Sequence, residues 1–276
     1  MTAVPKPSLT YLSFGAGVQS TALLVMSNLS LSDCPRADVA IFADTGDEPS
    51  WVYEQVERMT AWSKIPVVVV TAGCISADTV ARHRGGRTRF AAIPAFTMGS
   101  DGRAAMLRRQ CTREYKIEPI EKHVRGMFGL AKGQRAKGRV QAKALIGISL
   151  DEATRMKPSR TAWVENLYPL VDAGMRRSDC IKLILAQGLP EPKKSSCVFC
   201  PYHGDEFWRG MKKNYPVEFE KAASFDENIR DMSKSGVKGQ VFLHRSLVPL
   251  RVIDFDRQFR MFPDLEDEEC EGSCFL

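Results

Sequence analysis

The stretch LTYLSFGAGVQSTALLVMSNL, residues 9–29, decides the fold of this chain. Residues 9–14 are mostly apolar and predict a buried strand, and residues 20–29 have the pattern of a helix. The turn between them contains Gly15 and Gly17, which let backbone N–H groups approach an anion. Free N–H groups and the dipole at the start of a helix favour negative charge. The stretch therefore predicts a strand, a phosphate-binding turn and a helix in succession.

The pattern of strand and helix repeats after this stretch. Residues 38–43, 65–71 and 144–149 predict three further strands, and residues 50–64 predict an amphipathic helix. Because the strands are apolar throughout and alternate with helices, they indicate a parallel sheet covered on both faces. We expect an α/β fold, a Rossmann-like doubly wound parallel sheet followed by a helical, cysteine-rich C-terminal part.

Composition excludes several classes of protein. Of 276 residues, 44% are apolar and 26% are charged, which excludes disordered, collagen-like and coiled-coil chains. No apolar run approaches the roughly 18 residues that span a bilayer, and residues 1–10 lack the apolar core of a secretory signal. We therefore expect a cytoplasmic location. In such a protein, eight cysteines indicate metal binding or catalysis rather than disulfides.

The positive charge of the chain is concentrated in one segment. Residues 103–143 contain twelve lysines and arginines against three acidic residues, a net charge of +9 that exceeds the +6 of the whole chain. Such a segment suits a phosphate-bearing partner, either a nucleotide or a nucleic acid such as tRNA or DNA. The alternative is a solvated surface loop without a partner.

The phosphate-binding turn lacks the lysine of a Walker A loop and the G-x-G-x-x-G spacing of a dinucleotide fold. It resembles the pyrophosphatase loop (PP-loop) of the adenine nucleotide alpha hydrolase superfamily, in the branch of the phosphoadenosine phosphosulfate (PAPS) reductases. The resemblance extends to Asp44-Thr45-Gly46 after the second strand, to residues 111–120, to residues 147–155 and to the cysteine-rich segment. It implies a nucleotide site made by Ser13, Gly15, Gly17, Gln19, Ser20, Thr21, Asp44, Thr45, Gly46, Glu152 and Arg155.

Two domains are expected on this basis. Residues 1–160 would form a PP-loop domain with a basic insertion at about residues 84–140. Residues 161–276 would form a helical iron–sulfur region that ends in an acidic tail with six carboxylates in residues 264–271.

One position departs from the family pattern. Nucleotide-hydrolysing members commonly carry an aspartate just before the final serine of the loop, where this chain has Gln19. The loss of that carboxylate weakens the case for Mg²⁺, which prefers anionic oxygens. If Mg²⁺ binds, Asp44, Asp47 or Glu48 would have to supply the ligand, and the resemblance gives Asp44 a catalytic role beside the phosphates.

The cysteines suggest a metal centre. Cys197 and Cys200 form a CxxC pair, and with Cys111 and Cys180 they make a set of four that suits either structural Zn²⁺ or a [4Fe–4S] cluster. Resemblance to the PAPS reductase-like proteins implies the [4Fe–4S] cluster, ligated by all four. Zinc, and the absence of a metal, remain as alternatives.

Two cysteines lie near the C-terminus. The sequence around Cys270 resembles the Glu-Cys-Gly tail whose cysteine attacks sulfur in sulfonucleotide reductases, although Glu271 interrupts the motif. Together with Cys274 it would form the catalytic thiol pair, able to carry a persulfide or to form a disulfide. The alternative is a frayed tail with ordinary thiols.

Three functions are compatible with these observations. The first is a PP-loop ATP pyrophosphatase and sulfurtransferase that activates an acceptor, such as tRNA or DNA, with an adenine nucleotide and then receives sulfur from a donor protein or thiol. The second is a sulfonucleotide reductase that releases sulfite from adenylylsulfate or its 3′-phosphate. The third is a zinc-stabilised nucleic-acid-binding protein without catalysis.

Overall fold

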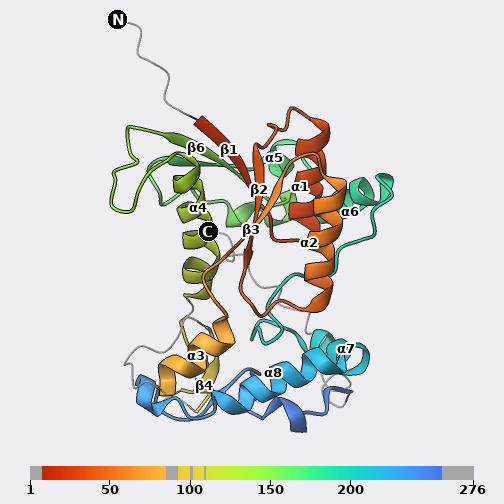
Figure 1. Cartoon of the computed structure of the whole chain (residues 1–276). Helices are drawn as coiled ribbons and strands as arrows, with labels where there is room; N and C mark the ends of the chain where they lie inside the picture. Colours follow the sequence, from red (N-terminus) through yellow and green to blue (C-terminus); the bar gives the residue numbers. More distant parts are fainter. Residues whose placement is uncertain (1–7, 85–92, 100–101, 109, 257–276) are drawn as a thin grey trace, which may run out of the picture.

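The computed structural model describes residues 8–84, 93–99, 102–108 and 110–256. Its main feature is a five-stranded sheet, all of whose strands are parallel, in the order β3-β2-β1-β6-β7 (Figure 1). The strands are β1 (Ser8–Ser13), β2 (Val39–Asp44), β3 (Val67–Thr71), β6 (Gln141–Ile146) and β7 (Val164–Leu167).

Helices cover both faces of this sheet. Leu12 and Phe42 pack on one face against α1 (Val18–Leu29), α2 (Ser50–Trp62) and α6 (Arg177–Ala186). Tyr11 and Ile41, which point the opposite way along the same strands, pack against α4 (Glu118–Met127). The predicted α/β class, a parallel sheet wound on both faces, is therefore confirmed.

A second, smaller body lies below the sheet in Figure 1. It contains α3 (Ile75–Arg84), α7 (Asp205–Asn214), α8 (Pro216–Asn228) and an antiparallel sheet of order β5-β4-β8. The strands of that sheet are β4 (Phe96–Met98), β5 (Ala104–Met106) and β8 (Val241–Phe242). The 96–106 hairpin of the basic insertion thus pairs with the C-terminal part of the chain. Ile93, Ala95 and Leu107, which flank the hairpin, pack in one core with Trp208 and Phe225.

The short elements complete the chain. A π-helix, η1 (Thr112–Ile117), leads into α4, and α5 (Pro169–Asp172) precedes α6. Three 3₁₀ helices are η2 (Leu150–Arg155), η3 (Ser233–Ser235) and η4 (Leu250–Val252). None of the helices in the described ranges is long and apolar enough to cross a membrane.

The strand predicted at residues 144–149 lies three residues earlier, at β6, and β7 has no counterpart in the prediction. The reason is a turn at Gly147, where the chain leaves the sheet beside the start of α1. A Cβ at Gly147 would lie 2.8 Å from Ser20 N and 2.9 Å from Ser20 Cα, closer than real Cβ contacts. Glycine is therefore required where the chain leaves β6 beside the start of α1. We call the turn at residues 14–17, between β1 and α1, the phosphate loop after its predicted role.

The order of the strands places a crevice at this point. Strand β1 has β2 on one side and β6 on the other, and the Ser13 and Ile146 ends lie in register. Connections leave the two strands toward opposite faces, so a gap opens at their carboxyl ends, where open α/β sheets bind ligands.

We predict that Gly147→Ala lowers the free energy of unfolding by about 1–3 kcal/mol, because the added methyl group meets the backbone of α1. Thermal unfolding would show this as a melting temperature lower by roughly 2–4 °C per kcal/mol. The matched control is Gly126→Ala in α4, where a Cβ meets nothing within 4 Å. That control should gain about 0.5–1 kcal/mol from helix propensity, and an equal loss in both variants would contradict the close-approach argument.

Candidate functional site

The turn between β1 and α1 presents the start of a helix to the crevice. Gly17 is the N-cap of α1 and no side chain caps its first turn, so backbone N–H groups there lack an intrahelical partner. Ala16 has a φ of 58°, in the left-handed region that non-glycine residues rarely adopt. Ser20 Oγ accepts from Gly15 N and donates to Gly17 O, both at 3.2 Å, which holds the turn in shape. The turn therefore combines a strained backbone with free amides, the arrangement of an anion site.

Gln19 joins the loop to the segment after β6. Its Nε2 donates to Glu152 Oε2 at 3.2 Å, and its Oε1 accepts from Arg177 Nη1 at 3.3 Å. Arg155 forms an ion pair with the other oxygen of Glu152. The structure thus brings Gln19, Glu152 and Arg155 together, and their predicted role in nucleotide binding stays a prediction. These contacts also explain why position 19 carries glutamine and not the aspartate of the similar loops. A carboxylate at this position would lie next to the carboxylate of Glu152 and would be repelled by it.

Two buried donors beside this network have no hydrogen-bond partner among the described residues. They are Ser149 Oγ, on a residue that is fully buried, and Arg155 Nε. Buried polar groups in native proteins are nearly always satisfied, and an unsatisfied one points to a missing ligand, ion or water. Both lie on the chain that follows β6 at the carboxyl edge, so they indicate that a polar ligand belongs at this edge.

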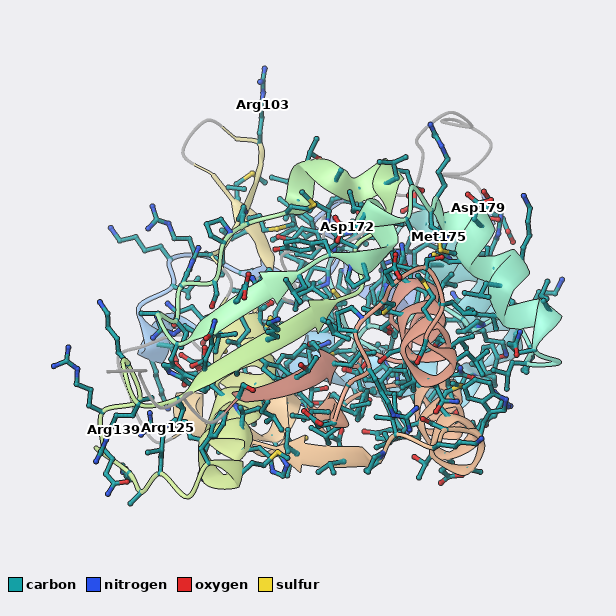
Figure 2. All side chains as sticks on the ribbon, turned by 90° about the horizontal axis from the view of Figure 1, so that it is seen from above. Arg103, Arg125, Arg139, Asp172, Met175 and Asp179 are labelled. Carbon is teal, nitrogen blue, oxygen red and sulfur yellow. The ribbon has the colours of Figure 1, made fainter. Side chains whose placement is uncertain are left out.

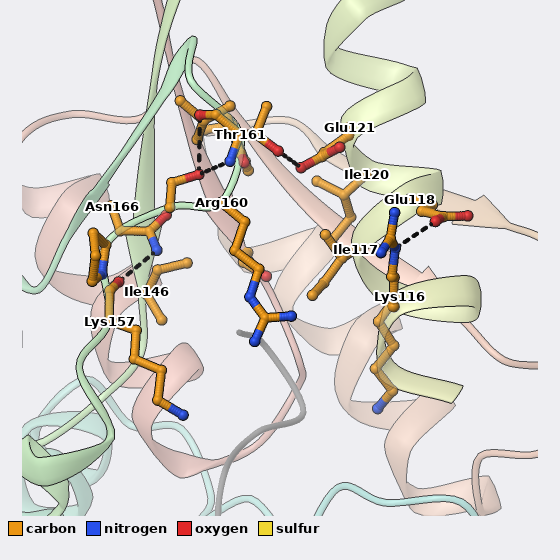
Figure 3. Close-up of a pocket in the computed structure, with 16 residues that line it drawn as sticks. Lys116, Ile117, Glu118, Ile120, Glu121, Ile146, Lys157, Arg160, Thr161 and Asn166 are labelled. Atoms are coloured by element: carbon orange, nitrogen blue, oxygen red, sulfur yellow. Dashed lines mark hydrogen bonds and ion pairs between the residues drawn. The ribbon is translucent and has the colours of Figure 1, made fainter. Parts of the chain in front are cut away.

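A cavity of about 370 Å³ lies beside Ser13 and Ile146, the last residues of β1 and β6, and extends along β7 to Val164, across from η1 and α4 (Figure 3). Ser13, the last residue of β1, lies in its wall directly before the phosphate loop. The apolar part of the lining consists of Tyr11, Ile117, Ile120, Ile146, Pro158 and Val164. A cavity with apolar walls beside a helix N-terminus can hold a ligand with a planar body and phosphate groups.

The polar part of this cavity is rich in cations. Lys116, Lys157 and Arg160 extend toward the same side of the pocket, the lower one in Figure 3. The acids in the lining are already engaged, since Glu118 pairs with Arg113 at 2.8 Å and Glu121 accepts a hydrogen bond from Thr161. Among the described residues, the side chains of Lys157 and Arg160 have no acidic partner.

Sequence reasoning missed Lys157 and Arg160. They occur in Lys157-Pro158-Ser159-Arg160, directly after the segment at residues 151–155 that was expected at the sheet edge. The signal in the sequence that could have identified them is that both cations lie within five residues of this segment. The sequence did not predict β7, the strand into which residues 157–161 lead. It therefore did not show that these residues lie in one cavity with Ile146 at the end of β6.

The β2 edge holds the remaining predicted nucleotide residues. Asp44 Oδ1 accepts hydrogen bonds from Gly46 N at 2.8 Å and from Tyr53 Oη at 2.9 Å. Burial and the bond to Asp44 raise the pKa of Tyr53, so its hydroxyl stays protonated as a donor. Asp47 accepts from the backbone N and the hydroxyl of Ser76 at 2.8 and 2.6 Å. Asp44 and Asp47 thus accept hydrogen bonds from protein donors, whereas Oε2 of Glu48, the third carboxylate considered for Mg²⁺, is buried without a hydrogen-bond partner among the described residues.

A buried ion pair connects this edge to the cavity. Lys116 Nζ lies 3.4 Å from Glu48 Oε1, and the two side chains are only 14% and 2% exposed. Thr45 Oγ1 donates to the same Glu48 oxygen at 3.1 Å and lies 3.3 Å from Cys197 Sγ. Burial, and then the charge of Glu48, raise the pKa of Cys197 well above its usual value. Cys197 is therefore a neutral thiol in this structure.

The cysteine-rich segment closes against the phosphate loop. Val198 N donates to Asp47 O at 2.9 Å, and Trp51 Nε1 donates to Lys194 O at 3.0 Å. A Cβ placed on Gly17 would lie 2.8 Å from Ser195 Oγ, so this serine is in close contact with the loop. The loop, the β2 edge and residues 194–198 thus form one continuous wall.

The structure does not assemble the predicted set of four cysteines. Cys111 and Cys197 pack on the same apolar core, and the charge of Cys111 contributes to the raised pKa of Cys197. Cys180 instead lies fully buried in the core between α1 and α6, where burial raises its pKa to about 12. Within the described ranges, no group of three or more His, Cys, Asp or Glu side chains is placed to hold a metal ion. The arrangement therefore does not fit a four-cysteine cluster, because its expected fourth ligand packs elsewhere.

His203, the other residue of this segment with ligand chemistry, is buried. Its Nε2 lies 3.0 Å from Cys197 O and its ring stacks on Phe207 at 3.8 Å. Burial lowers its pKa to about 3, so the imidazole is neutral. Cys270, Cys274 and the acidic tail lie outside the described residues, and their predicted catalytic role stays a prediction.

The basic segment of residues 103–143 is divided among several places. Arg125 and Arg139 extend outward at one end of the molecule, and Arg103 extends from a separate hairpin (Figure 2). Lys116, from the same segment, lines the cavity. The segment therefore does not form one patch, and its predicted binding of nucleic acid stays a prediction.

We predict that Lys116→Met lowers the free energy of unfolding by about 3–5 kcal/mol, because it leaves the buried Glu48 carboxylate without its cation. Lys116→Met combined with Glu48→Gln should recover much of this loss, since the amide still accepts from Thr45 and carries no charge. Urea unfolding followed by tryptophan fluorescence measures both values. Equal losses in the single and the double variant would show that the ion pair has no such role.

We also predict that iodoacetamide leaves Cys180 and Cys34 unmodified in the folded protein. Both are buried, and burial raises their pKa values to about 12 and about 11, so little thiolate is present. Peptide mass spectrometry after brief treatment, with and without urea, measures the labelling. Fast labelling of Cys180 without urea would be inconsistent with its position in the core.

Comparisons with known proteins give little beyond the fold. No family model matches the chain, and no curated protein matches it. Among solved structures, the chain is similar to the crystal structure of phosphoadenylyl-sulfate (PAPS) reductase from Candida auris in a phosphate complex, with 13% sequence identity and a TM-score of 0.42. The match covers 71% of this chain and 83% of that chain. At this level of similarity, the function has to be inferred from the site itself.

Proposed function

We propose that this protein is an enzyme that binds an adenine nucleotide at the carboxyl edge of its parallel sheet and uses it to activate an acceptor for sulfur incorporation. The observation that carries the proposal is the cavity beside the phosphate loop, into which Lys157 and Arg160 project without an acidic partner among the described residues. The choice of adenine, and of sulfur, comes from the motif resemblance in the sequence.

The phosphates of the nucleotide would lie between the amides of the loop and these two cations. Arg160 offers a planar fork that can bind a phosphate through two parallel hydrogen bonds, and Lys157 adds a point charge. Ser149 Oγ and Arg155 Nε, the unsatisfied donors on the chain after β6, are further candidates for phosphate oxygens. The nucleoside would use the apolar wall formed by Ile117, Ile120 and Val164.

The chemistry that suits this arrangement is nucleotide cleavage between the α- and β-phosphates. An oxygen of the acceptor attacks the α-phosphorus, a new P–O bond forms, and the bond to the bridging oxygen breaks to release pyrophosphate. The outer sulfur of a donor persulfide then attacks the activated carbon and loses its proton, while the C–O bond breaks and AMP leaves. A second thiol of the donor attacks the resulting mixed disulfide, so that its S–S bond breaks, a donor disulfide forms and the sulfur stays on the acceptor. Fixed cations and amides lower the barrier by stabilising the charge that develops on the phosphates.

No step of this proposal passes through a metal cluster. Within the described ranges, no group of three or more His, Cys, Asp or Glu side chains is placed to hold a metal ion, and Cys197 Sγ lies 3.3 Å from Thr45 Oγ1. In this proposal, the contribution of the CxxC segment is to close the wall beside the loop.

Arg160→Ala should weaken binding of ATP by roughly tenfold or more, because a hydrogen bond to a charged group contributes about 1.5–3 kcal/mol. Isothermal titration calorimetry with ATP, AMP and adenosine measures the affinity for ligands with three, one and no phosphate groups. The loss of affinity should be largest for ATP and absent for adenosine. The matched control is Arg139→Ala, an exposed arginine that does not line the cavity. If both variants bind ATP like the wild type, the cavity is not the phosphate site.

The reaction class is tested with the same protein under anaerobic conditions. Pyrophosphate release from ATP, lost in Arg160→Ala and kept in Arg139→Ala, would support the proposal. Thiol-dependent release of sulfite from adenylylsulfate or its 3′-phosphate, without pyrophosphate release, would replace it with a sulfonucleotide reductase. Nucleic-acid binding with neither product would favour a binding protein without catalysis.

A further inference from the structure

A second cavity, of about 460 Å³, lies between the start of α2, residues 191–194 and α7. Its lining shares no residue with the cavity assigned to the nucleotide. Three aromatic side chains from different elements enclose it, namely Trp51, Phe207 and Tyr215. The ring centroids of Trp51 and Tyr215 are 4.5 Å apart, and those of Trp51 and Phe207 are 6.3 Å apart. We call this cavity the aromatic pocket, because the rings of Trp51, Phe207 and Tyr215 form part of its wall.

Cations surround these rings. Lys193 Nζ lies 4.7 Å from the centroid of Tyr215 and 5.9 Å from that of Trp51, and Lys194 Nζ lies 5.6 Å from that of Phe207. Arg177 also lines the cavity, and Glu191 is the only acid in its lining. The combination of ring surfaces with an excess of positive charge fits a ligand that has a flat, uncharged ring and a phosphate group. Proteins that bind single-stranded nucleic acid combine aromatic side chains, on which bases stack, with cations that contact the backbone, and this pocket has both features.

The pocket is connected to the phosphate loop at two points. Arg177, in its wall, donates to Gln19 of the loop at 3.3 Å. Lys194, also in its wall, is held by Trp51 Nε1 at 3.0 Å and is followed by Ser195, which contacts Gly17. A ring bound here would lie next to the residues that adjoin the phosphates of the nucleotide.

We propose that this aromatic pocket binds an unpaired base of a single-stranded nucleic acid, with Lys193, Lys194 and Arg177 contacting its phosphates. The inference rests on the proposed function and names its acceptor: the base is held beside the loop at which the nucleotide is cleaved. Stacking on aromatic side chains accommodates every base, while the cations bind the backbone. The lysine that now covers Tyr215 would move to a phosphate when the base enters.

The test uses the full-length protein and a fluorescein-labelled single-stranded oligodeoxythymidylate, with fluorescence anisotropy at several salt concentrations. Tyr215→Leu should weaken binding by roughly 5- to 100-fold, because it removes one stacking surface. Tyr215→Phe keeps the ring and should bind within about twofold of the wild type, so the pair separates stacking from the hydroxyl that Lys193 contacts. Thermal unfolding and ATP titration of each variant show whether it is folded and whether the nucleotide site is intact.

Charge is tested separately. Lys193→Ala should weaken binding and reduce the slope of log affinity against log salt by about 0.7, the value for one phosphate contact on a single strand. The control is Lys234→Ala, an exposed lysine in η3, which packs near α3 and not at this pocket. Lys234→Ala should leave both the affinity and the slope unchanged.

Each outcome decides the inference. Loss of oligonucleotide binding in Tyr215→Leu and Lys193→Ala, with ATP affinity unchanged, would support it. If ATP affinity falls together with oligonucleotide affinity, the pocket holds the base of the nucleotide and the inference is wrong. If the wild type binds ATP but no oligonucleotide, or if Tyr215→Leu binds like the wild type, the inference fails while the proposed function stands. Loss of ATP binding in Arg160→Ala is the independent check on that function.

Discussion

The structure depends on the close approach of β6 to the start of α1. Gly147 lies so near Ser20 that no side chain fits between them, and this contact keeps the ends of β1 and β6 side by side. α1, which follows β1, packs on one face of the sheet, and Ile148 and Trp163, from the connection after β6, pack on the other, an arrangement that in open α/β sheets leaves a crevice at the carboxyl ends of the two strands. The phosphate loop, the residues after β6 and the cation-lined cavity all have their positions through this contact.

The cysteine-rich segment depends on the same edge. Val198 bonds to Asp47, Lys194 to Trp51, and Ser195 lies against Gly17, so residues 194–198 form part of the wall rather than a separate module. Cys197 is partly buried in this wall beside Glu48 and Thr45, and these surroundings raise the pKa of its thiol. The same wall contains the buried ion pair of Lys116 and Glu48. Removing either side chain would leave the other charge buried without a partner and would lower the stability of the fold.

Charge is distributed so that anions are attracted to two neighbouring pockets. In the first, Glu118 and Glu121 are occupied by protein donors, which leaves Lys157 and Arg160 directed into the cavity. In the second, lysines lie over aromatic rings, where a base and its phosphate can both be accommodated. Arg177, which bonds to Gln19, belongs to the second pocket and touches the loop of the first. The second pocket is thus joined by this hydrogen bond to the loop that follows Ser13, a residue in the wall of the first cavity.

The sequence by itself predicted four of the five strands of the parallel sheet and the glycine-containing turn between β1 and α1, because these depend on hydrophobic periodicity and on motifs that are local in the chain. It assigned Gln19, Glu152 and Arg155 to one site only through the family resemblance, since Gln19 and Glu152 are 133 residues apart. It did not reveal β7, the cations at 157 and 160, the isolation of Cys180 or the aromatic pocket. Each of these arises from segments far apart in sequence: Cys180 is removed from the other cysteines because α6 packs it against α1, and Trp51 meets Tyr215 across more than half of the chain. Spacing shows which side chains are near one another along the chain, and only packing decides which of them meet.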